Sequence, residues 1–354
     1  MIHAVPSAEA QLEFLRKLRR LLDEGGFVAS YKFALLHAIA DLCVTRGDDT
    51  GAPLPLGLEE LAGEYIRLYW RQTTPFPGLA ALETLAQNTG RQAAVVNWIR
   101  EVRPDYVGRL ARFEKSSDWD RLVRKVGRKI EEMPLWRLQT VGTEPDEFLY
   151  ENHPDRRVDG IELKPGVAYC FRAFYPMIAE MVQVAWTQYV RGTNLDRLGP
   201  QAELRNFLFG TQREDLSSYR RILRDVQSGG CFYCGRAMTR GDEAVDHFVP
   251  WRRYPLDLGH NFVLAHRSCN AAKADRLAAT LHLQRWHERN LNELYELPLR
   301  FDNERLPHDR EASLRIARWA YQLEASTDGK VWVKGRELVR LPANWQAVLK
   351  RMST

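Results

Sequence analysis

The side chains best suited to chemistry are concentrated between residues 231 and 273. Two cysteine-containing pairs bracket this stretch, "CFYC" at its start and "HRSC" near its end. Polar side chains that bind metal ions or move protons lie between and just after these pairs. The stretch is therefore either a zinc-stapled loop that only holds its shape or a site built for catalysis. The candidates are Cys231, Cys234, Asp246, His247, Asn261, His266, Cys269, Asn270 and Lys273.

The two cysteine-containing pairs have the spacing of a structural zinc site. Zinc prefers four nitrogen or sulfur ligands in a tetrahedron, and each closely spaced pair supplies two of them from one turn. A redox Cys-x-x-Cys motif is the alternative, but it predicts a thioredoxin-like context that the sequence lacks and gives the second pair no role. We therefore predict one structural Zn²⁺ at Cys231, Cys234, His266 and Cys269. With four protein ligands this ion holds the fold, and catalysis must come from other residues.

The residues between the zinc pairs meet the needs of phosphodiester hydrolysis. This reaction needs an activated water, a cation on the scissile phosphate and relief of charge on the leaving oxygen. Histidine titrates near pH ~6.5, so His247 can serve as a general base near neutral pH. Asp246 and Asn270 offer oxygen ligands for Mg²⁺ or another divalent ion. Taken alone, the Asp-His pair would favour a zinc module that only binds, with the two side chains as a hydrogen-bonded pair.

Together these elements resemble the zinc-stapled branch of the HNH endonucleases. That branch has the order Cys-x-x-Cys, Asp-His-apolar-x-Pro, Asn-apolar, Cys-x-x-Cys-(His or Asn) and Lys. This chain reads "CFYC", "DHFVP", "NFVL", "HRSCN" and Lys273, and the resemblance covers residues 228 to 280. It departs from the pattern at His266, where cysteine is usual. The last motif residue is Asn270, which makes the chain an H-N-N variant that the family also contains.

The resemblance implies a ββα-metal fold with a role for each residue. Two strands carry the Asp-His pair and the central asparagine, and a helix carries the final ligand. His247 is then the general base, Asn261 braces the loop and orients His247, and Asp246 and Asn270 hold the catalytic ion. Lys273 then lies near the phosphate as a candidate DNA contact, with an ordinary solvated lysine as the alternative. Successive strand residues point to opposite faces, so Asp246 and His247 need a local twist or a strand end to share one site.

Basic residues outside the motif are candidate DNA contacts. Arg252 and Arg253 in "PWRRYP" are predicted on the loop between the two strands, with a solvated loop tip as the equal alternative. Two predicted helices carry further basic clusters, interpreted as solvated faces unless they meet phosphate: Arg121, Arg124, Lys125, Arg128 and Lys129, and Arg220, Arg221 and Arg224. A second metal site is a weaker alternative to exposed turn residues for the acidic group Glu144, Asp146, Glu147 and Glu151.

Apolar periodicity and turn signals predict an α+β protein with a mainly helical N-terminal region. We predict four parts. Residues 1–120 form a helical domain for DNA or partner recognition, and residues 121–226 form a mixed, mostly helical connecting domain. Residues 227–285 form the ββα-metal nuclease domain, and residues 286–354 form a C-terminal helix and hairpin extension. Segment 77–103 predicts two helices joined by a turn. An ordinary helical hairpin is favoured there over a helix-turn-helix DNA reader that would use Arg91, Gln92 and Asn97.

The composition fits a soluble protein of two or three domains. The chain has 51 Lys and Arg against 46 Asp and Glu, a net charge of +5 that permits a nucleic-acid partner without demonstrating one. Five cysteines and no apolar leader segment argue against a disulfide framework and favour a cytoplasmic location. No stretch approaches the length of a bilayer span, so we predict no membrane partner.

The sequence therefore predicts a metal-dependent HNH endonuclease that hydrolyses phosphodiester bonds in double-stranded DNA. By analogy it is a nicking or restriction and anti-phage nuclease, with other proteins of a defence system as further partners. One alternative is a zinc-dependent nucleic-acid-binding or scaffold protein without catalysis, and another is a nuclease directed at RNA. The scaffold would tolerate change at His247 and Asn270, whereas the nuclease would not.

Overall fold

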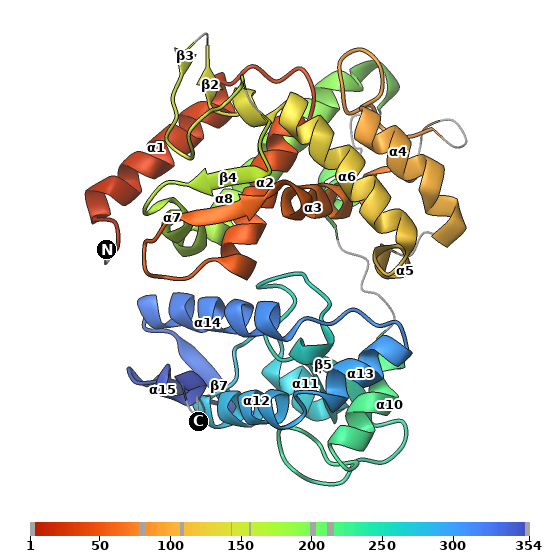
Figure 1. The fold of residues 1–354 in the computed structure, drawn as a ribbon. Coiled ribbons are helices and arrows are strands. Elements are labelled where there is room, and N and C mark those ends of the chain that lie inside the picture. The colour runs from red at the N-terminus through yellow and green to blue at the C-terminus, as the bar shows by residue number, and fades with distance from the viewer. Residues whose placement is uncertain are drawn as a thin grey trace. The chain divides into compact units, whose positions relative to one another are not determined.

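The chain folds into two compact units, Met1–Thr211 and Gln212–Thr354, called unit 1 and unit 2 (Figure 1). The computed structural model describes residues 4–77, 79, 83–106, 110–142, 144–155, 157–198, 203–210 and 216–350. Within this part of the chain, each unit combines helices with two small two-stranded antiparallel sheets. The predicted mixture of α and β structure is confirmed, while the finer four-part division stays a prediction.

Unit 1 is organised around the buried helix α2 and the longer helix α8. Every residue of α2 from Phe33 to Val44 is buried, a pattern typical of a helix inside a core. Trp186 of α8 packs edge-on against Tyr69, with 5.3 Å between ring centroids, and donates a hydrogen bond to Gln87. The elements of unit 1 are α1 (Ala8–Glu24), α2 (Tyr31–Arg46), β1 (Leu54–Gly57), α3 (Leu58–Gln72), α4 (Ala94–Val102), η1 (Arg103–Tyr106), α5 (Leu110–Glu114), α6 (Ser117–Glu132), η2 (Leu135–Arg137), β2 (Thr140–Val141), β3 (Glu144–Pro145), β4 (Gly160–Leu163), α7 (Val167–Ala173), α8 (Tyr175–Thr193), η3 (Leu195–Arg197) and α9 (Leu204–Phe209).

The helical hairpin predicted over residues 77–103 is only half present. Helix α4 provides its second helix, but residues 83–93 are not helical, and residues 78 and 80–82 lie outside the described part of the chain. Side chains satisfy the backbone here in place of helical hydrogen bonds. The Gln92 side-chain oxygen accepts from the N–H groups of Gln87 and Ala93, and Asn194 bonds both backbone groups of Ala86. Tertiary contacts therefore override the local helical pattern.

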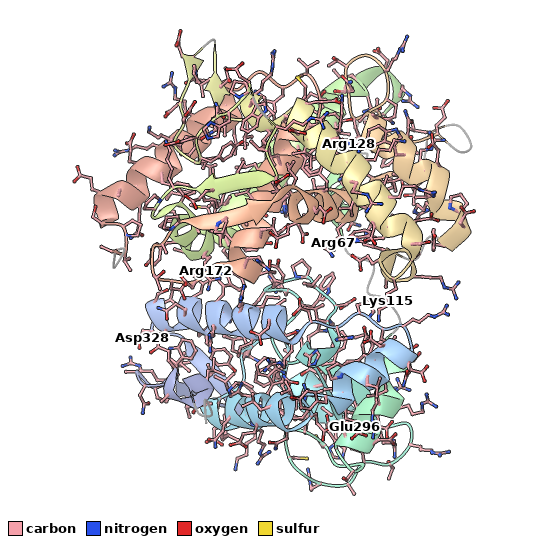
Figure 2. The ribbon with its side chains drawn as sticks, in the orientation of Figure 1. Arg67, Lys115, Arg128, Arg172, Glu296 and Asp328 are labelled. Atoms are coloured by element: carbon pink, nitrogen blue, oxygen red, sulfur yellow. The ribbon has the colours of Figure 1, made fainter. Side chains whose placement is uncertain are left out.

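The predicted basic cluster of unit 1 lies on the exposed face of α6, where Figure 2 labels Arg128. The opposite face buries Leu122, Val126 and Ile130. Lys125 lies over the Trp98 ring, 4.3 Å from its centroid, which is a cation–π contact. A role for this face in binding phosphate stays a prediction.

Unit 2 consists of a short ββα motif together with longer helices and a C-terminal hairpin. Strands β5 and β6 pair antiparallel, with Glu243 opposite His266 and His247 opposite Phe262, and α11 follows β6 directly. The expected ββα order is therefore present. The elements of unit 2 are α10 (Ser217–Val226), β5 (Glu243–His247), η4 (Gly259–Asn261), β6 (Phe262–His266), α11 (Arg267–Lys273), α12 (Thr280–Asn292), α13 (Glu296–Asn303), α14 (Arg310–Ser326), β7 (Lys330–Lys334), β8 (Glu337–Arg340) and α15 (Ala347–Lys350).

Helix α12 completes the ββα motif by satisfying its backbone. Arg289 donates to the carbonyls of His260 and Phe262, at 2.8 and 2.6 Å. Arg285 donates to the carbonyls of Phe232 and Tyr233, at 3.2 and 3.3 Å. Buried carbonyls without partners are costly, so these arginines stabilise the loops that carry the candidate site. The Arg289 bonds cross the predicted boundary after residue 285, whereas the Arg285 bonds lie within the predicted nuclease domain.

Candidate metal centre and catalytic site

The first zinc pair is held by a tight turn. Cys231 N–H donates to the Arg236 carbonyl and Gly235 N–H donates to the Cys231 carbonyl, both at 2.9 Å. Gly235 has a φ of +72°, which glycine adopts without the strain that a side chain would introduce. Phe232 N–H donates to the Leu264 carbonyl at 2.9 Å, which fixes the turn to β6. The turn therefore presents Cys231 and Cys234 beside the end of that strand.

The second zinc pair follows at the junction of β6 and α11. His266 is the last residue of the strand, and Cys269 lies in the first turn of the helix. The His266 Nε2 atom lies 3.3 Å from the Ala237 carbonyl, and its Nδ1 atom lies 3.4 Å from the Cys234 sulfur. Because a carbonyl only accepts, Nε2 carries the proton and Nδ1 keeps its lone pair toward the cysteines. A hydrogen bond on the outer nitrogen is the usual support of a metal-binding histidine.

The four side chains form one cluster that suits a metal ion such as zinc. The ligand atoms of Cys231, Cys234, His266 and Cys269 all lie within 4.8 Å of one another. Burial opposes ionisation of Cys234, but hydrogen bonds from Arg236, Cys231 and His266 lower the pKa of its thiol to about 6. Burial and the neighbouring cysteines raise the pKa of Cys269 to about 12. A divalent cation offsets the repulsion between adjacent thiolates, so the donor set fits Zn²⁺.

Asp246 and Lys273 form a buried ion pair behind the strand. The Lys273 ammonium lies 3.0 Å from Asp246 Oδ2 and donates to the His247 carbonyl at 2.8 Å. The Tyr233 hydroxyl donates to the same carboxylate oxygen at 2.5 Å, and burial together with Asp246 raises the pKa of Tyr233, so this hydroxyl stays protonated. Lys273 is 0% exposed, so its ammonium has no surface for DNA. The predicted direct contact of Lys273 with phosphate does not fit this placement, because a buried cation requires its countercharge inside the protein.

His247 ends β5 and faces a different carboxylate. Its Nε2 atom lies 2.6 Å from Asp257 Oδ1, and its ring packs edge-on against Phe262, with 4.7 Å between ring centroids. Asp257 belongs to the loop that joins β5 to η4. Adjacent strand residues point to opposite faces, so Asp246 and His247 have separate partners even at the strand end.

Asn261 clamps the loop that follows His247. Its side-chain oxygen accepts from the Val249 N–H at 2.8 Å, and its amide donates to the Val249 carbonyl at 3.0 Å. Its own carbonyl accepts from Phe248 N–H at 2.7 Å. These bonds agree with the predicted bracing role. Asn261 ends the short η4 turn just before β6, however, and does not lie within the strand.

The structure gives no support to the catalytic Mg²⁺ predicted at Asp246 and Asn270, and this site stays a prediction. The Asp246 Oδ1 atom and the side-chain amide of the half-buried Asn270 form no hydrogen bond with any described residue. Lys273, however, places a positive charge on the other oxygen of Asp246. The Cys-His cluster is the one group of at least three His, Cys, Asp or Glu side chains suited to a metal in the described ranges. That result also gives no support to a second metal site in the acidic segment from Glu144 to Glu151.

The two loop arginines differ in their availability to DNA. The Arg252 side chain is 84% exposed and pairs with the exposed Asp275 at 2.9 Å. Arg253 instead pairs with the largely buried Glu324 of α14 at 2.7 Å, which makes it a brace of the loop. Arg252 is thus the more accessible candidate for a phosphate contact. On α10, Arg221 pairs with Glu304 and Arg224 pairs with Glu243, while Arg220 is exposed.

Two side chains of this region were missed by sequence reasoning. Tyr233 lies inside the Cys-x-x-Cys turn, and Asp257 lies ten residues after its partner His247. Neither has a motif spacing that marks it, because both partnerships depend on how the loops fold back. The polarity of Asp257 in the otherwise apolar and proline-containing stretch "YPLDLG" was the available signal.

His260, beside Asn261, is a buried histidine without a hydrogen-bond partner on either ring nitrogen among the described residues. It is 1% exposed, and burial, with Arg289, His308 and Arg310 nearby, lowers its pKa to about 3. The folded-state pKa of His260 lies below the unfolded value near ~6.5. The free energy of unfolding is therefore not reduced by this group above pH ~6.5, and it falls as the pH drops from there toward 3.

We expect His260→Leu to reduce the acid sensitivity of unit 2. Each pH unit between about 6.5 and 3 costs the wild-type protein about 1.4 kcal/mol through this group, and the variant lacks that slope. Urea unfolding of both proteins at pH 7 and pH 5, followed by tryptophan fluorescence, measures the difference. Equal loss of stability in both proteins on acidification would contradict the assignment.

Comparisons with known proteins found no matching family model, no matching curated protein and no matching solved structure. None of the helices in the described ranges combines the length and the apolar character needed to cross a bilayer.

Proposed function

We propose that the chain is a metal-dependent endonuclease of the HNH type that hydrolyses phosphodiester bonds in DNA. The observation that carries the proposal is the position of His247 at the end of β5, in a ββα motif that Asn261 braces and the Cys-His cluster staples. A histidine oriented by a carboxylate can take a proton from water near neutral pH. The attacking water oxygen then bonds to phosphorus as the bond to the leaving oxygen breaks.

The charge distribution supports a nucleic-acid partner for unit 2. Residues 212–354 contain 24 Lys and Arg against 18 Asp and Glu, a net charge of +6, whereas residues 1–211 contain 27 against 28. An excess of cations on one unit attracts the phosphate backbone without sequence specificity. The exposed Arg252 on the loop after His247 is a specific candidate contact.

The ion pair of Asp246 with Lys273 favours a second candidate function. It neutralises the predicted metal ligand, as suits a zinc-stapled module that binds nucleic acid or a partner protein without cutting. Incubation of the purified protein with supercoiled plasmid, in Mg²⁺, Mn²⁺ or EDTA, separates the two. Binding of the plasmid without cleavage under every condition favours the second function. A parallel assay on RNA tests the alternative of a nuclease directed at RNA. The proposed nuclease function includes a role in restriction or anti-phage defence.

We expect a single chain to nick DNA and not to cut both strands in one event. The sequence contains one Asp-His…Asn…Asn set, and one site reaches one phosphodiester at a time. On supercoiled plasmid at low protein concentration, open circles accumulate before linear DNA, at a rate proportional to protein concentration. Linear DNA that appears directly would contradict this expectation. A rate that rises with the square of protein concentration would instead indicate cleavage by a dimer.

A further inference from the structure

The Asp257 carboxylate forms a hydrogen bond with His247, the candidate general base. The loop that carries Asp257 is held in place by several contacts. The Asn261 clamp fixes Val249 at the start of the loop, and the ion pair of Arg253 with Glu324 fixes its middle. Leu256 N–H donates to the Tyr254 carbonyl at 2.9 Å, just before Asp257. The side chains of Asp257 and His247 are 21% and 11% exposed, so water only partly screens their contact.

The geometry of this contact determines which ring nitrogen of His247 carries the proton. A carboxylate accepts hydrogen bonds, so the 2.6 Å contact with Asp257 places the proton on Nε2 and leaves the lone pair on Nδ1. The edge-on packing against Phe262 restricts rotation of the ring. Asp246 does not take this role, because its Oδ2 atom is bound by Lys273 and Tyr233.

We infer that Asp257 is a positioning residue that fixes His247 with its proton on Nε2, so that Nδ1 is the atom that accepts a proton from water. The catalytic consequence rests on the function proposed above. As the water oxygen bonds to phosphorus, its proton moves to Nδ1, and the bond from phosphorus to the leaving oxygen breaks. The hydrogen bond from Nε2 to Asp257 persists and stabilises the imidazolium, the role that a carboxylate has behind the histidine of a catalytic triad.

The test uses the full-length, zinc-loaded protein with Asp257→Asn and Asp257→Glu. The ¹⁵N chemical shifts of the His247 ring, assigned against the spectrum of His247→Gln, report the protonated nitrogen at one fixed pH. We expect an Nε2-protonated ring in the wild type, a mixture of both tautomers in Asp257→Asn, and recovery in Asp257→Glu. Plasmid cleavage by Asp257→Asn should fall at least about 10-fold in kcat with KM unchanged. Asp225→Asn, an exposed carboxylate on α10, is the matched control that should change neither readout.

Two results would overturn the inference. One is an unchanged His247 tautomer in Asp257→Asn. The other is a loss of Mn²⁺ binding in that variant, followed by paramagnetic broadening, with the tautomer intact, since Asp257 would then be a metal ligand. If the tautomer changes as expected but the wild-type protein cuts no DNA, the positioning role stands and the proposed nuclease activity fails.

Discussion

His247→Ala is expected to lose plasmid cleavage by at least ~100-fold while it folds, retains zinc and binds DNA. The general base is removed, and the partly solvent-exposed Asp257 is left without its partner at modest cost to stability. No zinc ligand contacts the imidazole, so the Cys-His cluster stays intact. The cleavage rate is measured on supercoiled plasmid, and DNA binding is measured separately in EDTA.

The matched control for this variant is His153→Ala. His153 is half-buried and lies in unit 1, outside the candidate site, so its removal should change neither binding nor cleavage. Undiminished cleavage by His247→Ala would exclude His247 from the reaction. A parallel loss in both histidine variants would instead point to a general effect on folding.

Cys231→Ser is expected to lose the bound zinc and the fold of the surrounding turn. The Cys231 sulfur is buried in the cluster and also accepts from His266 N–H at 3.4 Å, so the substitution weakens both zinc pairs. Zinc binding in such modules supplies roughly 10 kcal/mol or more of folding free energy. Elemental analysis should show about one zinc ion per wild-type chain and almost none in the variant.

Hydrogen exchange locates the damage in that variant. The Phe232 amide, which bonds the Leu264 carbonyl, and the Gly235 amide should both lose protection. Cys170→Ala, a buried cysteine of α7 in unit 1, is the control and should retain the metal. Normal protection and full activity in zinc-free Cys231→Ser would show that the metal has no structural role.

The Cys-His cluster could be predicted from the sequence because its geometry is local. Each pair spans one turn, and the hydrogen bond from Phe232 N–H to the Leu264 carbonyl holds the first pair beside the end of β6, where the second pair begins. The bracing role of Asn261 came from the resemblance to the HNH endonucleases, and its hydrogen bonds to Val249 agree with that role. The prediction of the cluster needed only the spacing of a few residues.

The electrostatic partners of the site could not be predicted in the same way. Lys273 seemed a surface residue near phosphate, but the α11 face that carries it turns inward, where Asp246 and the His247 carbonyl receive its charge. Asp257 depends on a loop conformation that the sequence pattern does not determine. The non-helical conformation of residues 83–93, within the predicted 77–103 hairpin, has a similar cause, because distant Asn194 binds the backbone there.

The arginines of α12 limit how far the ββα motif can be transplanted. Their guanidinium groups complete the hydrogen bonding of the Phe232, Tyr233, His260 and Phe262 carbonyls. The Trp332 backbone in β7 is bonded in turn to Leu277 and Ala279, just before this helix. A graft of the motif residues alone into another scaffold would carry the metal ligands but leave these carbonyls exposed to competing water. The smallest portable version of the site is therefore the whole of unit 2.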